Sequence, residues 1–226
     1  MKKASCYIQT ILSAAAFFVC FGCQSKGPTQ PVLSEGEFVI EGHLPADRYE
    51  NAVLFLVPEQ GPHPRPVDSV FVSKDGSFRF TGNVEQVACL RLSRKVRMGI
   101  QDLLVVTEPG LTKVVLDSVS SSSGTPQNDA LQRFKDHRFE MGKAYRGYYE
   151  YREVATPEAA DDSLRVLRKR DGDFNYELLK EQGRNTLSLF LFKMTANSMD
   201  SLQREELRPL LTDTVDYSKP QPGFRK

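Results

Sequence analysis

The sequence predicts an α+β protein, with an N-terminal antiparallel β-sandwich or barrel-like sheet followed by a C-terminal helical segment. Residues 36–117 hold short apolar runs separated by turn residues, which is typical of an antiparallel β domain. Residues 126–215 instead repeat apolar side chains every three to four positions, as amphipathic helices do. The serine-rich stretch 118–125 lies between them and is predicted to be a linker.

The overall charge excludes one large class of partner. The 226 residues include 30 Lys and Arg against 29 Asp and Glu, a formal net charge of +1. Because nucleic-acid binding calls for a basic excess or a basic face, we expect no nucleic-acid partner. Apolar residues make up 40% of the chain and aromatic residues 10%, which favours a folded core over disorder.

The first 22 residues are typical of a secretory signal peptide. Lys2 and Lys3 precede a mostly apolar run from Ile8 to Phe21, which is too short for a comfortable membrane span. The Cys20-x-x-Cys23 pair has the spacing of a thioredoxin redox motif. Because that pair lies at a targeting segment, we assign it no redox role.

Gly22-Cys23 resembles the lipobox of bacterial lipoproteins, in which an invariant cysteine is lipidated and becomes the first residue after cleavage. The resemblance implies lipid attachment at Cys23, since Cys20 follows Val19 and is a poorer acceptor. Residues 23–35 are predicted to be a flexible tether. Some lipoproteins of the Bacteroidetes type carry early acidic residues that direct export to the cell surface. No acidic run follows Cys23, so we expect a lipid-anchored cell-envelope protein that faces the periplasm.

Seven strands are expected in the β domain, because short apolar and β-branched runs alternate with turn signals. The expected strands cover residues 37–43, 51–57, 67–73, 77–82, 86–93, 101–107 and 111–117. One turn has two possible lengths. A two-residue turn at Asp75-Gly76 pairs Val72 with Arg79, whereas a three-residue turn at 74–76 pairs Val72 with Phe78. We favour the longer turn, which keeps the apolar side chains on one face and places Gly76 where positive φ is needed.

Four helices are expected in the C-terminal half. Thr125-Pro126 and Thr156-Pro157 each have the pattern of an N-cap followed by proline in the first helical turn. A third helix is predicted over residues 187–194, and a fourth begins after Asp200, where Gln203 completes a capping box. The remaining residues, 216–226, are assigned to a C-terminal tail.

Candidate binding residues are few. Arg91 belongs to a dense basic cluster that is either a solvated hairpin tip or a loop that contacts anions or lipid headgroups. The cluster comprises Arg91, Arg94, Lys95 and Arg97. On the first helix, Tyr145, Tyr148 and Tyr149 fall on the apolar stripe, so core packing explains them. Tyr151 lies off this stripe and is a weak ligand candidate.

We expect no catalytic residue, metal site or cofactor. The three histidines lack metal-ligand spacing, and Asp171-Gly172-Asp173 lacks the other ligands of a calcium loop. We interpret that triplet as a solvated helical kink. Cys89 lies in the strand-like run Val87-Ala88-Cys89-Leu90, which predicts a buried, inert thiol.

A family resemblance extends over most of residues 36–215. It rests on turn and glycine residues in order, among them Gly76-Ser-Phe-Arg-Phe80, Thr107-Glu108-Pro109-Gly110 and Asn128 at a helix start. The pattern resembles the uncharacterised N-terminal β-sandwich domain of Bacteroidetes lipoproteins. In many such proteins this domain precedes a thioredoxin-like domain of the peroxiredoxin or cytochrome-maturation type. The sequence ends at Lys226, about where that domain begins in such proteins, so we expect it to be absent.

Two functions remain open from the sequence. The first is a membrane-anchored, non-enzymatic accessory or binding module, with the membrane and an envelope protein as its expected partners. The second is the accessory half of a thiol-disulfide oxidoreductase system whose thioredoxin-like domain is lost or separately encoded. An enzyme with an unrecognised site is a third hypothesis, which no motif favours.

Overall fold

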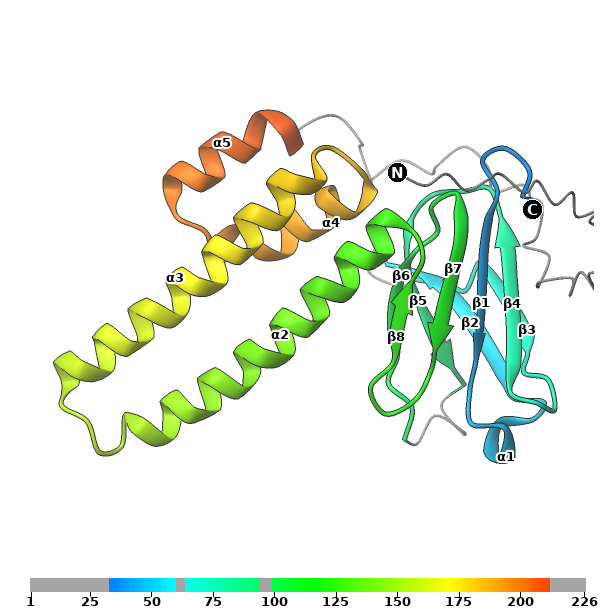
Figure 1. Cartoon of the computed structure of the whole chain (residues 1–226), viewed down its shortest axis with the longest axis horizontal. Coiled ribbons are helices and arrows are strands. Elements are labelled where there is room, and N and C mark those ends of the chain that lie inside the picture. The colour runs from blue at the N-terminus through cyan, green and yellow to red at the C-terminus, as the bar shows by residue number, and fades with distance from the viewer. Residues whose placement is uncertain (1–32, 60–63, 94–98, 212–226) are drawn as a thin grey trace, which may run out of the picture. The chain divides into compact units, whose positions relative to one another are not determined.

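The computed structural model describes residues 33–59, 64–93 and 99–211. Within these ranges two β-sheets are followed by a set of helices, which confirms the α+β prediction (Figure 1). The strands are β1 (Phe38–His43), β2 (Val53–Pro58), β3 (Asp68–Phe71), β4 (Ser77–Gly82), β5 (Val87–Leu92), β6 (Leu103–Val106), β7 (Gly110–Val115) and β8 (Ser121–Ser123). The helices are α1 (Ala46–Tyr49), α2 (Pro126–Tyr151), α3 (Pro157–Gln182), α4 (Thr186–Thr195), the 3-10 turn η1 (Ala196–Ser198) and α5 (Ser201–Leu211).

The strands form two four-stranded sheets that share a core. Sheet A has the order β4-β1-β7-β8, and sheet B has the order β3-β2-β5-β6. All pairs are antiparallel except β1 and β7, which run parallel, so sheet A is mixed where the sequence predicted antiparallel pairing. Five strands separate β1 from β7 in the chain, and this long connection allows the parallel direction. Residues such as Ile40, Leu54, Phe80 and Leu103 fill the space between the sheets.

The turn between β3 and β4 has the predicted three-residue length. Ser73 N–H donates to the Ser77 carbonyl at 2.9 Å, and Gly76 has a φ of +83°. Phe78 is buried as the longer turn requires, whereas Arg79 is exposed. Beyond this turn the strands separate, because β3 pairs with β2 in sheet B while β4 pairs with β1 in sheet A.

The prediction of a linker at residues 118–125 is wrong. Ser121–Ser123 form β8, which pairs antiparallel with β7. Ser120 and Ser122 are buried, and the Ser120 hydroxyl donates to the Gln101 carbonyl at 2.7 Å. Serine composition favours a linker, but these residues instead find hydrogen-bond partners in the neighbouring strand and loop.

The predicted helix starts are confirmed. Helices α2 and α3 begin at Pro126 and Pro157, directly after threonines at their N-cap positions. The Thr156 side chain accepts from Ala159 N–H at 3.3 Å, whereas Thr125 makes no side-chain capping bond. The capping box before α5 also forms, since Gln203 N–H donates to Asp200 at 2.8 Å and Asp200 N–H donates to the Gln203 side chain at 3.1 Å. Local sequence signals were sufficient here because capping involves residues only three positions apart.

Helix α2 is attached to the sandwich by buried polar groups. Glu108, directly before the turn into β7, accepts hydrogen bonds from the backbone N–H groups of Gln127 at 2.7 Å and Asn128 at 3.0 Å. A carboxylate at this position stabilises the positive end of the helix dipole. The Gln127 side chain extends the attachment to α4, because its Oε1 accepts from Leu187 N–H at 2.9 Å. Glu108 and Asn128, two positions of the sequence pattern that carries the family resemblance, therefore have a structural role.

The same helix covers the outer edges of two strands. The Asn128 amide accepts from Val106 N–H at 2.9 Å and donates to the Val106 carbonyl at 2.7 Å, in the manner of a neighbouring strand. One turn later, the Gln132 side chain accepts from Ser122 N–H at 3.1 Å. The outer edges of strands β6 and β8 therefore both bond to side chains of α2.

Farther along, α2 leaves the sheets and packs beside α3 (Figure 1). Leu131, Phe134 and Met141 are buried, as the apolar stripe predicted. The prediction that Tyr149 packs in the core is wrong, because its side chain is 56% exposed. Of the described helices, α3 is the one that packs along this distal part of α2, so few described neighbours bury the stripe there. Tyr145 and Tyr148 on the same stripe are partly buried.

Candidate functional site

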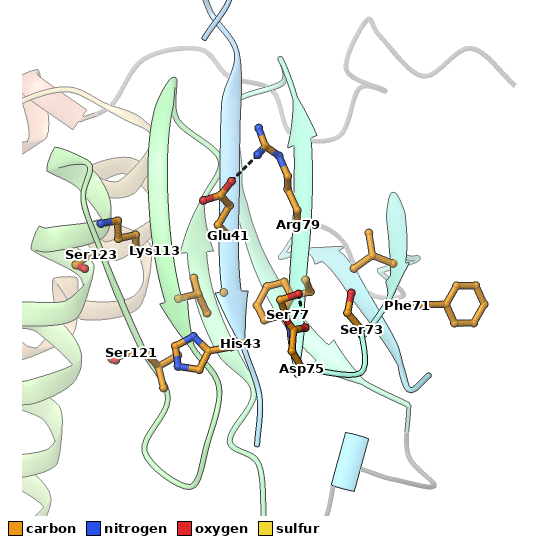
Figure 2. Close-up of a pocket in the computed structure, with 15 residues that line it drawn as sticks. Glu41, His43, Phe71, Ser73, Asp75, Ser77, Arg79, Lys113, Ser121 and Ser123 are labelled. Carbon is orange, nitrogen blue, oxygen red and sulfur yellow. Dashed lines mark hydrogen bonds and ion pairs between the residues drawn. The ribbon is translucent and has the colours of Figure 1, made fainter. Parts of the chain in front are cut away.

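The outer face of sheet A carries a row of charged side chains. Successive residues of a strand point to opposite faces, so the residues opposite the core share this face. The register places Glu41 of β1 directly between Arg79 of β4 and Lys113 of β7. Arg79 forms an ion pair with Glu41, and both side chains are partly exposed (Figure 2). Lys113 is exposed and has no ion-pair partner among the described residues, which leaves one cation in excess.

A second row lies two residues along the same strands. His43 of β1 is placed between Ser77 of β4 and Val115 of β7. Asp75 accepts hydrogen bonds from the Ser77 hydroxyl at 2.7 Å and from its backbone N–H at 3.0 Å, and these bonds lower the pKa of the Asp75 carboxyl. Because the Ser77 hydroxyl donates to Asp75 rather than to His43, these residues do not have the arrangement of a nucleophile and its base.

Together the two rows line an open groove of about 930 Å³. The groove extends from Ser121 and Ser123 of β8, across the sheet, to the end of β3 (Figure 2). Phe71 at that end is 71% exposed and points away from the sheet face. The lining offers cations, carboxylates and hydroxyl groups, which suit binding of a polar ligand or a polypeptide.

The floor of this groove is tightly packed. Gly42 lies between the two rows of β1, and a Cβ added there would approach the Phe78 ring and the Val114 carbonyl to 2.5 Å each. The Phe78 ring is therefore packed directly beneath the β1 backbone. This packing fixes the β1 backbone that carries Glu41 and His43.

The residues predicted as binding candidates from the sequence do not line this groove. Arg91 on β5 is half-buried, and its guanidinium forms an ion pair with Asp102 at 2.9 Å. Tyr151 is exposed at the end of α2. Arg94, Lys95 and Arg97 lie outside the described residues, as does Cys23. The sheet and the helix therefore leave Arg91 and Tyr151 as separate surface positions rather than one site.

Cys89 is buried, as its sequence context predicted. Desolvation raises the pKa of its thiol to about 11, although the neighbouring Arg91 guanidinium opposes this shift. The thiolate is the nucleophilic form, so the raised pKa suppresses reactivity near neutral pH.

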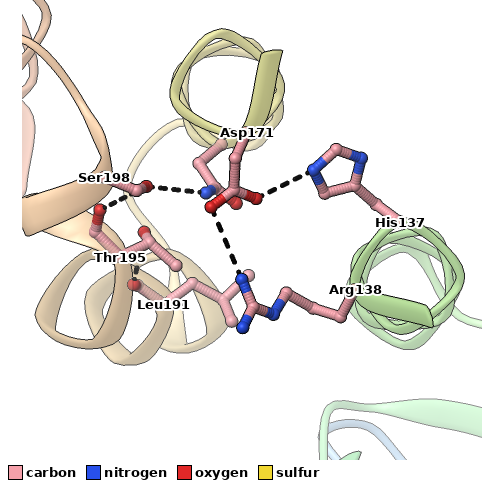
Figure 3. A network of polar contacts seen from close by, with 7 residues as sticks. His137, Arg138, Asp171, Leu191, Thr195 and Ser198 are labelled. Carbon is pink, nitrogen blue, oxygen red and sulfur yellow. Dashed lines mark hydrogen bonds and ion pairs between the residues drawn. The ribbon is translucent and has the colours of Figure 1, made fainter. Parts of the chain in front are cut away.

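A second polar cluster lies between α2 and α3 (Figure 3). The Asp171 carboxylate contacts the His137 ring at 3.0 Å and the Arg138 guanidinium at 3.4 Å. The His137 ring also stacks on Phe174, with ring centres 3.7 Å apart. The His137 and Asp171 side chains are both only 8% exposed, so their contact is enclosed between the helices and joins them, whereas the Arg138 side chain is 55% exposed.

The interpretation of Asp171-Gly172-Asp173 as a solvated kink is therefore wrong. Helix α3 continues through the triplet, and Asp171 and Gly172 are both buried. A Cβ at Gly172 would lie 2.4 Å from the Ser198 carbonyl, so the glycine allows η1 to approach the helix closely. The sequence lacked a signal for this contact because Gly172 and Ser198 belong to different elements.

No described residues form a group of three or more His, Cys, Asp or Glu side chains that could hold a metal ion. The groove residues Glu41, His43, Arg79 and Lys113 were missed as site candidates. Their strands were predicted, and strand alternation would have placed each on an outer face. The pairing of β1 with β4 places Arg79 beside Glu41, and the parallel pairing of β1 with β7, which the sequence pattern did not indicate, places Lys113 on the other side of Glu41.

Residues 38–131 match the model of a family described as a domain of unknown function, DUF4369. This segment includes all of the strands described above and the first turns of α2. No curated protein and no solved structure matches the chain. Among the helices of the described residues, none has both the length and the apolar character needed to cross a membrane.

Proposed function

We propose that this chain is a lipid-anchored, periplasm-facing accessory protein that binds an envelope partner through the outer face of sheet A. The groove across that face carries the proposal. Its rows present an excess cation, a paired carboxylate and several hydroxyl groups on a fixed floor. Such a surface recognises a partner by charge and hydrogen bonding without transferring a chemical group.

The groove is tested by capture from intact envelopes. Lys113→Glu replaces the excess cation by an anion, and we expect it to reduce recovery of cross-linked partner by about tenfold. Lys143→Glu makes the same charge change on α2, outside the groove, and serves as the matched control. Equal recovery with the two variants would reject the groove as the binding surface.

The anchor is tested separately. Cys23→Ser should release the protein from membranes or leave an uncleaved precursor, because the modified cysteine is the attachment point. A variant with Cys20→Ser is the control and should remain attached. A Cys23→Ser protein that is still cleaved, lipidated and membrane-bound would contradict the proposed localisation.

The resemblance to domains that precede thioredoxin-like domains makes a thioredoxin-like envelope protein one candidate partner. In that case this chain supplies binding, and its partner supplies the reactive cysteines. Cys89 is unsuited to exchange because its thiol is buried and its pKa is raised. We therefore expect no insulin reduction above the dithiothreitol background, either from the chain or from its Cys89→Ser variant. Turnover that disappears in Cys89→Ser would assign the chain to redox chemistry instead.

A further inference from the structure

We propose that the free edge of β4 binds an extended polypeptide segment, which adds to sheet A as a fifth strand. This inference rests on the proposed function and names the class of its partner. The first observation is the position of β4 in the sheet. Among the described strands, β4 is the outermost strand of sheet A and pairs only with β1.

The backbone of β4 leaves hydrogen-bonding groups at this edge. In an antiparallel pair, alternate residues direct their N–H and C=O groups away from the partner strand. Ser77 is such a residue, because its carbonyl accepts from Ser73 and its N–H donates to Asp75. Arg79 and Thr81 follow at two-residue intervals and direct their groups to the same edge. Both residues are exposed, and no described residue bonds to these outward groups.

The other strand edges are covered or shorter. Asn128 bonds to the backbone of Val106 at the β6 edge, and Gln132 bonds to Ser122 at the β8 edge. At the edge of the four-residue strand β3, the Asp68 carboxylate accepts from Ser69 N–H at 2.7 Å. Proteins usually protect strand edges with such contacts, with proline or with bulges. The six-residue strand β4 has no proline, and its ladder with β1 is continuous from end to end.

Charge indicates what the added strand carries. Across sheet A, the row Lys113, Glu41, Arg79 alternates in sign. A residue paired with Arg79 on an added strand would extend this row by one position on the same face. A carboxylate there continues the alternation, and it contacts the free side of the Arg79 guanidinium. We therefore assign the occupant as an extended segment with an Asp or Glu opposite Arg79.

Depressions flank both halves of this edge. The main groove borders the half with Ser77 and Arg79 and continues to Val70 and Phe71. A smaller depression of about 190 Å³ borders Thr81 and Gly82 and is also lined by Val67, which lies directly before β3. Pockets beside an exposed edge accept side chains of the added strand, while the main-chain bonds supply much of the affinity.

The probe is a pair of synthetic peptides, acetyl-Thr-Val-Thr-Glu-Thr-Val-Thr-amide and the same sequence with Lys at its centre. Both are titrated against the full chain in detergent micelles. We expect the Glu peptide to bind roughly fivefold more tightly than the Lys peptide. Hydrogen exchange should slow at the Arg79 and Thr81 amides when the Glu peptide is bound. Failure of the Glu peptide to bind up to millimolar concentration would overturn the proposal.

Thr81→Pro is the decisive variant, because proline removes the outward N–H of Thr81 without removing a bond to β1. We expect it to weaken binding of the Glu peptide by about tenfold. Thr81→Val keeps the N–H, and as the matched control it should bind as the unmodified chain does. Circular dichroism checks that both variants fold. Equal affinity for the two variants would reject strand addition.

Charge reversal provides the second variant. The double substitution Glu41→Arg with Arg79→Glu keeps the ion pair but inverts the charge next to the edge. We expect the peptide preference to invert, with the Lys peptide now binding more tightly. An unchanged preference for the Glu peptide would show that the position opposite Arg79 does not select an acid, and would overturn this assignment.

Two outcomes separate this inference from the proposed function. Envelope capture that depends on Lys113 but is unaffected by Thr81→Pro would reject the added strand while retaining the groove. Concentration-dependent dimerisation of the full chain that Thr81→Pro abolishes would show that a second copy occupies the edge. That result would overturn the assignment to a partner polypeptide.

Discussion

The two sides of the sandwich, called its ends here, differ in how the backbone of their outermost strands is covered. At one end, β6 and β8 contact α2, whose Asn128 and Gln132 side chains bond to strand backbone. At the other end, β3 and β4 are joined by a turn but belong to different sheets, and no described residue bonds to the outward backbone groups of Arg79 and Thr81 on β4. The difference shows how an α+β domain can cover the strand edges of one side with its own helix, while an edge strand of the other side has no such contact within the described residues.

The sharpest test of this comparison is hydrogen exchange. The Val106 and Ser122 amides are bonded to α2 side chains, whereas the Arg79 and Thr81 amides face solvent at the β4 edge. We expect the Val106 amide to exchange more than a thousandfold more slowly than that of Thr81, after correction for intrinsic rates. Amide-resolved mass spectrometry or NMR measures this ratio. Comparable rates at the two ends would refute the distinction between closed and open sides.

Removing the Asn128 side chain removes the bonds between α2 and the edge of β6. Asn128 is fully buried, and its amide makes both bonds to Val106. Asn128→Ala leaves the Val106 N–H and C=O without partners in a buried position. We expect the free energy of unfolding to fall by about 3 kcal/mol, because each unsatisfied group costs about 1–3 kcal/mol. Urea denaturation measures it, with the exposed Arg146→Ala on the same helix as the near-neutral control.

A pH titration tests burial in β5, the strand next to β6. Burial raises the pKa of the Cys89 thiol from its ordinary value of 9.0 to about 11. Between these values the folded chain retains a proton that the unfolded chain releases. The contribution of Cys89 to the free energy of unfolding is therefore fully present below the pKa of the unfolded thiol, and it decreases as pH rises toward the pKa of the folded thiol. We expect a loss of about 2 kcal/mol by pH 11 that Cys89→Ala lacks. Parallel pH profiles of the two proteins would show that the thiol is not desolvated.

The smallest effect is expected at the open end. The Arg79 and Glu41 side chains are 48% and 38% exposed, and exposed ion pairs contribute little to stability. Arg79→Met should change the free energy of unfolding by less than about 0.5 kcal/mol. Chemical denaturation alongside Arg165→Met, which also removes an exposed ion pair, provides the comparison. A loss above about 1.5 kcal/mol would mean that the row stabilises the fold and is not reserved for binding.

Much of the fold could be predicted because its signals are local. Turn residues and apolar alternation indicated seven of the described strands, and Thr-Pro pairs marked the starts of α2 and α3. The short strand β8 was missed, since serine composition carries no strand signal and its partners lie in other elements. The exposure of Tyr149 was missed for a related reason. A helical stripe shows which face is apolar, but the neighbouring elements decide how much of that face is buried.

For the candidate site, too, some features follow from the sequence and others only from the tertiary structure. By itself, the sequence determined the fold class, the alternation that puts Glu41, Arg79 and Lys113 opposite the core, and the inert setting of Cys89. Only the tertiary structure decided that β1 pairs in parallel with β7, which sets Lys113 beside Glu41. It also decided that α2 bonds to the β6 and β8 edges, whereas within the described part of the chain nothing bonds to the outward groups of Arg79 and Thr81 on β4. Periodicity and capping depend on residues a few positions apart, whereas strand order depends on which distant segments bury their apolar faces together.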